Sequence, residues 1–144
     1  MYETIESLTY ENPVFLSIID DSGGCLFSKA FDEEIKWNDQ LLGFFLSAIN
    51  KFCHNLFNGT IDCITIGPYL LLFKPQGTFF CCYIFKGKEN VAHTRFNSFV
   101  ETITRSSGIH KELSSFNKNG SLLSHRMQIT LDLLASEIFC YQSK

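Results

Sequence analysis

Short apolar runs separated by turn residues occupy the start and the middle of the chain. Residues 13–20 are apolar on both faces and are followed by a turn of Asp, Ser and two glycines at 21–24, which is typical of a buried strand that enters a hairpin. Residues 25–31 alternate, with Cys25 and Phe27 on one side and Leu26 on the other. This second run therefore predicts a more exposed partner strand.

Three further runs predict an antiparallel meander. They cover residues 61–66, 69–74 and 78–85 and are separated by short segments rich in Gly and Pro. The last of them is apolar on both faces, like the run at 13–20. Strands of that kind belong in the middle of a sheet that is covered on both sides.

The apolar residues at 39–57 recur at helical spacing and predict a helix over this range. Asn38 or Asp39 would cap its beginning, and Asn58-Gly59 would end it. At 100° per residue, one apolar stripe is expected to face the sheet: Leu41, Phe45, Ala48, Ile49, Phe52 and Leu56. A second stripe runs beside it: Leu42, Leu46, Cys53 and Phe57. The polar arc, which includes Gly43 and Ser47, is correspondingly narrow.

The C-terminal part of the chain predicts two more helices. Residues 90–105 have one apolar face and are expected to stop at Gly108, whereas residues 109–116 are ambiguous between a loop and one helical turn. Residues 121–141 have a core stripe: Leu123, Met127, Leu131, Leu134 and Ile138. The opposite side of this helix has a further apolar line: Leu122, Ile129, Leu133 and Cys140.

The order of elements, β-β-α-β-β-β-α-α, predicts a single three-layer α/β domain over residues 1–144, with its core in 14–141. Placing the two doubly apolar strands side by side gives a five-stranded sheet of order 2-1-5-4-3. The first helix is then expected to cover one face of the sheet and the last two helices the other, because a doubly apolar centre needs two covers.

Composition and charge narrow the classes of function. The chain has 144 residues, 12 basic against 15 acidic, and a net charge of -3 without any block of like charge. Nucleic acid and anionic lipid are therefore not expected as partners. No signal peptide and no membrane-spanning run is predicted, so we expect a cytoplasmic protein.

Six cysteines lie inside the apolar segments: Cys25, Cys53, Cys63, Cys81, Cys82 and Cys140. Because they do not alternate with those segments as a disulfide framework would, we expect reduced and mostly buried thiols. There is no CxxC motif and no ligand spacing between the thiols and the histidines. No nucleotide-binding fingerprint is present either. We expect no metal, no cofactor and no catalytic residues.

The chain resembles the longin, or SNARE-like, family over residues 14–141. The resemblance rests on the hairpin at 18–24, the helix at 41–57 and the stretches 66–72 and 83–87, and it extends to longin and roadblock proteins of archaea with eukaryote-like trafficking genes. The related roadblock family begins with an additional helix and ends with one, whereas here thirteen residues precede the first predicted strand and two helices are predicted after the fifth. This departure favours the longin subtype, and a short helix at residues 4–8 would reopen the question. The resemblance implies a non-catalytic, dimerising platform in small-GTPase regulation or vesicle traffic.

The surplus apolar stripes predict where a second copy, a longin-like partner or a small GTPase would bind. The expected partner-binding residues are Leu42, Leu46, Cys53 and Phe57 on the first helix and Leu122, Ile129 and Leu133 on the third. The first helix is favoured because its two apolar stripes adjoin. For the third helix, packing of the extra line on the second helix is an equally good explanation. The alternative from another class is a small-molecule sensor of the PAS or GAF type, which would have several short helices between the second and third strands.

Overall fold

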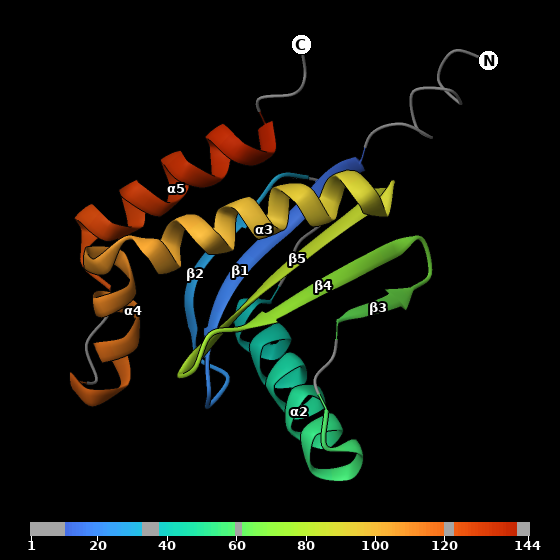
Figure 1. Ribbon diagram of the computed structural model, residues 1–144, viewed down its shortest axis with the longest axis horizontal. Coiled ribbons are helices and arrows are strands. Elements are labelled where there is room, and N and C mark those ends of the chain that lie inside the picture. Colours follow the sequence, from blue (N-terminus) through green and yellow to red (C-terminus); the bar gives the residue numbers. More distant parts are fainter. Residues whose placement is uncertain (1–10, 33–37, 60–61, 120–122, 141–144) are drawn as a thin grey trace.

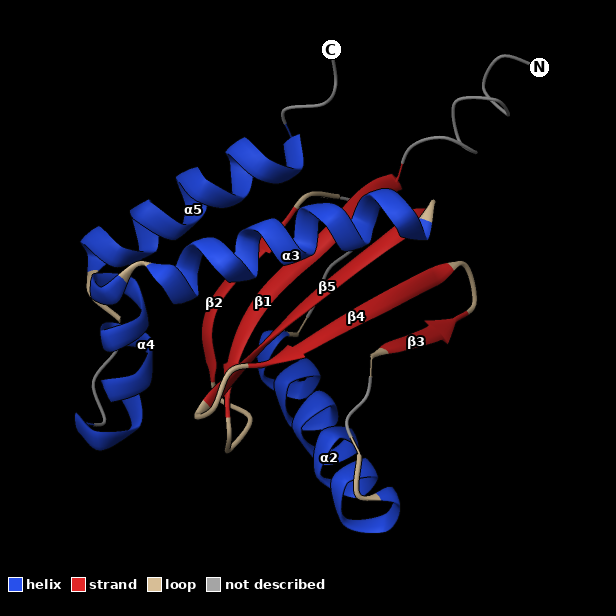
Figure 2. Cartoon of the chain, in the orientation of Figure 1, coloured by secondary structure: helices blue, strands red, loops and turns tan. Residues whose placement is uncertain are grey.

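The computed structural model describes residues 11–32, 38–59, 62–119 and 123–140. Apart from one additional helix, α4, the elements follow the predicted order (Figure 2): β1 (Glu11–Asp20), β2 (Cys25–Ala30), α2 (Asp39–Phe57), β3 (Cys63–Ile66), β4 (Tyr69–Pro75), β5 (Phe79–Gly87), α3 (Glu89–Arg105), α4 (Ser107–Asn119) and α5 (His125–Cys140). A helix at residues 4–8, which bears on the roadblock subtype, falls outside the described residues.

The segment after α3 differs from the prediction. In place of a loop or one turn, α4 is a helix of 13 residues, and α3 ends before Ser106 and not at Gly108. The Ser106 hydroxyl accepts a hydrogen bond from the Ile109 N–H at 3.4 Å, which caps the new helix. Ile109 and Leu113 are buried, so tertiary packing helps to hold this short helix in place.

The five strands form one antiparallel sheet of order β2-β1-β5-β4-β3, as predicted. The two doubly apolar strands, β1 and β5, lie side by side at its centre, with Leu16 opposite Tyr83 and Ile18 opposite Cys81. The pairing of β1 with β2 contains a bulge at Leu26. As a result Leu26 and Phe27 are both buried in the same cluster, although strict alternation predicted opposite sides.

Helices cover both faces of the sheet. α2 lies alone on one face, and α3, α4 and α5 lie on the other (Figure 1). The core on the α2 side consists of nine residues: Val14, Phe15, Ile19, Leu46, Leu71, Phe73, Phe80, Cys82 and Ile84. The core on the three-helix side is larger and includes Tyr83, Phe96, Phe99 and Phe139. The predicted arrangement of three layers is confirmed.

A buried polar cluster joins the beginning of β1 to the end of α5. Glu11 is fully buried and accepts a 2.6 Å hydrogen bond from the Tyr83 hydroxyl. The Arg95 guanidinium lies 3.2 Å from the same carboxylate and donates at 3.1 Å to the carbonyl of Phe139. The charge of Glu11 is therefore paired, as a charge inside a core must be. Of the described helices, none has the length and apolar content that crossing a bilayer requires.

Candidate functional site

The boundaries of α2 are set by the residues that the sequence predicted. The Asn38 side chain accepts a hydrogen bond from the Leu41 N–H at 3.0 Å, as an N-cap residue does. Asn58 adopts the left-handed conformation, with φ 55°, and its N–H donates to the His54 carbonyl. An Asn accepts this C-terminal conformation more readily than most residues.

Only the first half of α2 rests on the sheet. Gly43 lies directly against Gly23 of the β1–β2 turn, and a Cβ at position 43 would collide with the Gly23 carbonyl oxygen. Beside it the Ser47 hydroxyl donates to the Asp21 carbonyl at 2.9 Å. Leu46 completes the contact and is fully buried. The second half of the helix extends past the sheet (Figure 1).

The stripe that was expected to face the sheet is the exposed one. Leu41, Phe45, Phe52 and Leu56 are 65%, 45%, 59% and 62% exposed. Phe44 and Phe57, which flank this stripe, are 51% and 70% exposed. We call these six residues the α2 apolar surface. Such a continuous apolar patch is unusual on a monomer and is typical of an interaction site.

Of the residues predicted to bind a partner through α2, Leu46 is corrected to a core residue and Leu42 is partly buried against the same cluster. Cys53 is half-buried and Phe57 is exposed. Apolar spacing cannot choose between two adjacent stripes. The orientation of α2 is set by its small residues, because Gly43 and Ser47 allow this side of the helix to approach the sheet most closely. These two were assigned to the solvent-facing arc, and both are buried.

The line predicted on α5 is present but short. Ile129 and Leu133 are 47% and 64% exposed, so they do not pack on α3 as the alternative for this helix required. Arg126, Asp132 and Glu137 are exposed on the same helix. Leu122, the third predicted residue of this line, lies outside the described residues. Two apolar side chains among charges make a smaller patch than the α2 apolar surface.

The two edges of the sheet are protected unequally. At the β2 edge, the Gln128 side chain donates to the Leu26 carbonyl at 2.9 Å, and Lys29 forms a 2.9 Å ion pair with Asp132, so α5 covers this strand. The β2 edge also carries the bulge. β3 is a regular strand without a bulge, a proline or a charged side chain, which are the usual protective devices of an edge.

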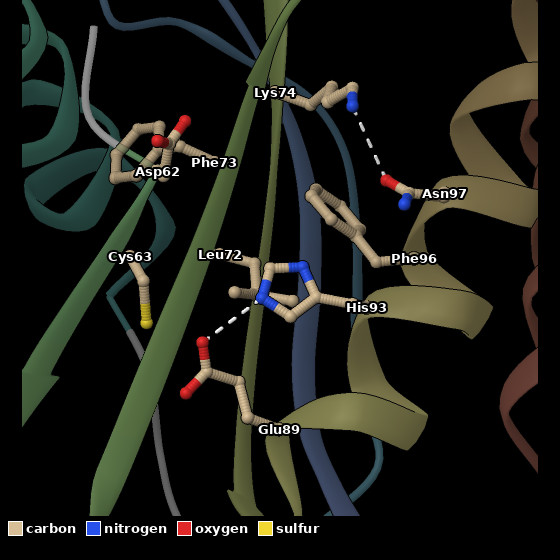
Figure 3. A pocket seen from close by; sticks show the side chains of 9 residues that line it. All are labelled: Asp62, Cys63, Leu72, Phe73, Lys74, Glu89, His93, Phe96 and Asn97. Carbon is tan, nitrogen blue, oxygen red and sulfur yellow. Dashed lines mark hydrogen bonds and ion pairs between the residues drawn. The ribbon is translucent and has the colours of Figure 1, made fainter.

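A cavity of about 330 Å³ lies beside β3, between the β3–β4 hairpin and α3 (Figure 3). Its floor includes Leu72 and Phe96. The Cys63 thiol and the Glu89 carboxylate lie at one end of the cavity. There, Oε2 of Glu89 lies 3.1 Å from Nε2 of His93. At the other end are two further polar side chains, Lys74 and Asn97, which are 3.4 Å apart.

The expectation of mostly buried thiols is wrong for three of the five cysteines whose side chains are described. Cys81 and Cys82 are fully buried on adjacent positions of β5, whereas Cys25, Cys53 and Cys63 are half-buried. All five are free thiols. Burial raises the pKa of Cys81 and Cys82, and it raises the pKa of Cys63 together with the nearby charge of Glu89. Within the described residues, no group of three His, Cys, Asp or Glu side chains is arranged to hold a metal ion.

No family model matches the chain, and no curated protein matches it. Similar solved structures include the gliding protein MglB from Thermus thermophilus, with 13% identity and a TM-score of 0.46 over 57% of this chain and 67% of that one. Myxococcus xanthus MglB has 12% identity and a TM-score of 0.48 over 60% and 76%. A Roadblock/LC7 domain from Streptomyces avermitilis has 12% identity and a TM-score of 0.42 over 59% and 75%. This likeness concerns the fold alone, and at these TM-scores no statement about function rests on it.

Proposed function

We propose that this domain is a non-catalytic assembly module that pairs, through the α2 apolar surface, with a second copy of itself or with a domain of the same fold. The observation that carries the proposal is the exposure of six large apolar side chains on one helix. Each of them, once buried, would contribute on the order of 1 to 3 kcal/mol to association.

The position of α2 makes its exposed surface accessible to a helix of the same kind in a partner domain. Its second half extends past the sheet (Figure 1), and Phe52 and Phe57 lie edge to face there, with their ring centroids 6.3 Å apart. Near the middle of the exposed stripe lies Ala48, which is itself exposed. A small residue at that point lets two such helices cross closely, with the aromatic rings packed on either side of the crossing.

The longin resemblance supports a finer proposal. Once paired, the module binds a small GTPase and serves in its regulation or in vesicle traffic, in the cytoplasm and at membranes only through its partners. Nucleotide-exchange and hydrolysis rates of purified small GTPases from the same organism, measured with and without the domain, test this role. Unchanged rates together with no binding of any nucleotide state would remove the finer proposal and leave the assembly role standing.

The assembly role is tested by sedimentation velocity of the wild type beside the double variant Phe52→Ser/Leu56→Ser. We expect the wild type to be a dimer at micromolar concentration and the variant to be a monomer. Its thermal unfolding, measured at a concentration where both proteins are monomeric, should be nearly unchanged because both side chains are exposed.

The matched control is Ile129→Ser/Leu133→Ser, which removes the two exposed apolar side chains of α5 and should leave the dimer intact. A wild type that stays monomeric, and that binds no domain of the same fold in a way that depends on Phe52 and Leu56, contradicts the proposal. Loss of the dimer in the α5 variant alone would move the interface to the other face of the molecule.

A further inference from the structure

The cavity between β4 and α3 lies above the sheet, on the face that the three helices cover. Leu72 of β4 and Phe96 of α3 are buried and form its floor. Lys74 projects to the same face as Leu72, because side chains two positions apart on a strand lie on one side. Glu89 and Asn97 come from the side of α3 that faces the cavity (Figure 3). The cavity therefore has an apolar floor and polar groups at two separate ends.

The two ends of the cavity carry opposite charges. At one end, Oε2 of Glu89 faces His93, and Oε1 has no hydrogen-bond partner within the described residues. At the other end, the Lys74 ammonium donates to Oδ1 of Asn97 at 3.4 Å. Because Asn97 is neutral, the charge of Lys74 has no acidic partner in the part of the chain that the structure describes. A ligand that fits both ends needs a cation and an anion.

The other two titratable residues that border the cavity do not remove this asymmetry. The pKa of Cys63 is raised, mainly by burial and further by the charge of Glu89, so this thiol adds no charge at neutral pH. The charge of Asp62 raises the pKa of Cys63 less than that of Glu89 does. Within the described residues Asp62 forms no ion pair with Lys74.

The separation of the two ends selects the length of the ligand. Glu89 and Asn97 are eight positions apart on α3, which corresponds to about 12 Å along the helix axis. A charge-assisted contact of about 3 Å at each end leaves roughly 6 Å between the charged groups of the ligand. An extended chain of four or five methylene groups spans that length. The buried side chains of Leu72 and Phe96 offer such a chain an apolar surface.

We propose that the cavity binds a small linear ω-amino acid, with its ammonium on Glu89 and its carboxylate between the Lys74 ammonium and the Asn97 amide. The methylene chain lies on the apolar floor. A cavity of about 330 Å³ suits a ligand of this size. The charges at both ends disfavour a simple amine or a fatty acid, which would leave one end without its partner. The site does not include the α2 apolar surface and does not depend on the assembly role.

The test titrates the isotope-labelled full chain with 5-aminopentanoate and follows its backbone amide spectra. Both charged contacts are partly exposed, so we expect a dissociation constant of about 1 mM. Pentanoate and pentylamine should each bind about tenfold more weakly, because each lacks one charge-assisted contact. Glycine has both charges but no spacer and should bind more weakly still. The amides of Leu72, Lys74 and residues 89–97 should shift most.

Two variants separate the two ends of the cavity. Glu89→Gln should weaken binding of 5-aminopentanoate about tenfold and leave pentanoate unchanged. Lys74→Met, which keeps a long side chain, should weaken 5-aminopentanoate and pentanoate and leave pentylamine unchanged. The matched controls are Glu101→Gln on α3 and Lys111→Met on α4, which change exposed residues that do not border the cavity. Both controls should bind like the wild type.

Equal binding of glycine and 5-aminopentanoate, or amide shifts confined to other elements, overturns the cavity as the site. Binding that survives both Glu89→Gln and Lys74→Met overturns the assignment of the two ends. No detectable binding at about tenfold the expected dissociation constant overturns the proposal as a whole. The Phe52→Ser/Leu56→Ser variant should bind 5-aminopentanoate like the wild type. A loss of binding there would place the ligand at the α2 apolar surface and would also overturn the proposal.

Discussion

The two faces of the sheet differ in how completely their helices cover them. On one face α3, α4 and α5 enclose a core in which Tyr83, Phe99 and Phe139 are buried together. On the other face a single helix makes contact through Leu46 and leaves six large apolar side chains in solvent. Three helices therefore enclose the core on one face of the sheet. The single helix on the other face has apolar side chains on its solvent-exposed side. Folding accounts for the first face, and association is the simplest use of the second.

The largest effect is expected on the closed face. Phe139 is 1% exposed and its ring lies 4.5 Å from that of Tyr83, between centroids. Phe139→Ala should lower the free energy of unfolding by about 4 kcal/mol, because it removes buried apolar area and leaves a cavity. Urea denaturation at low protein concentration measures this loss.

The matched change on the other face is Phe57→Ala, at a residue that is 70% exposed. It should alter the free energy of unfolding by less than about 0.5 kcal/mol. A similar loss in both variants would mean that α2 is packed more completely than its exposed surface indicates, and the contrast between the faces would disappear.

Sequence reasoning recovered the sheet order because it depends on a strong signal. β1 and β5 are apolar on both faces, and this property alone places them in the centre. The caps of α2 were also predictable, since Asn38 and Asn58 act through local hydrogen bonds. The three-layer arrangement followed from the need to cover both faces of the centre.

The features that were missed depend on tertiary contacts. The bulge at Leu26 is set by pairing with β1, and α4 is held by burial of Ile109 and Leu113. Which stripe of α2 faces the sheet is decided by the approach of Gly43 to Gly23. A glycine and a serine four residues apart in this helix were the available signal, and they were interpreted as part of a solvent-facing arc.

The second prediction tests the corrected orientation of α2. Leu46→Ala should lower the free energy of unfolding by about 3 kcal/mol, since Leu46 is fully buried against the sheet. Leu56→Ala, in the same helix but 62% exposed, should change it by less than about 0.5 kcal/mol and should weaken self-association. Denaturation and sedimentation of the two variants give the comparison. The reverse order of stabilities would restore the orientation that was first expected from the stripe of Leu41, Phe45 and Phe52.

The last prediction concerns two neighbouring thiols, one in the core of each face. Cys81 belongs to the core on the three-helix side and Cys82 to the core on the α2 side, and both are fully buried. Burial raises the pKa of each thiol, and for Cys82 the adjacent Cys81 adds to the effect. The folded state thus keeps two protons that the unfolded state releases once the pH passes the ordinary thiol value of about 8.5. Because the unfolded state then binds fewer protons, stability is retained below that pH and is lost as the pH rises above it.

Urea denaturation should show little pH dependence from these thiols near neutral pH and, above about pH 9, a decrease that approaches about 1.4 kcal/mol per pH unit for each buried thiol. Cys81→Ala and Cys82→Ala should each remove one thiol's share of that slope, whatever their effect on stability at neutral pH. A slope that neither variant changes would mean that the thiols are not the groups that titrate. If the α2 face opens locally, water reaches Cys82 in the folded state and lowers its pKa toward the ordinary value. The slope lost with Cys82→Ala would then be smaller than that lost with Cys81→Ala, and the difference would measure how much less securely one helix closes a face than three.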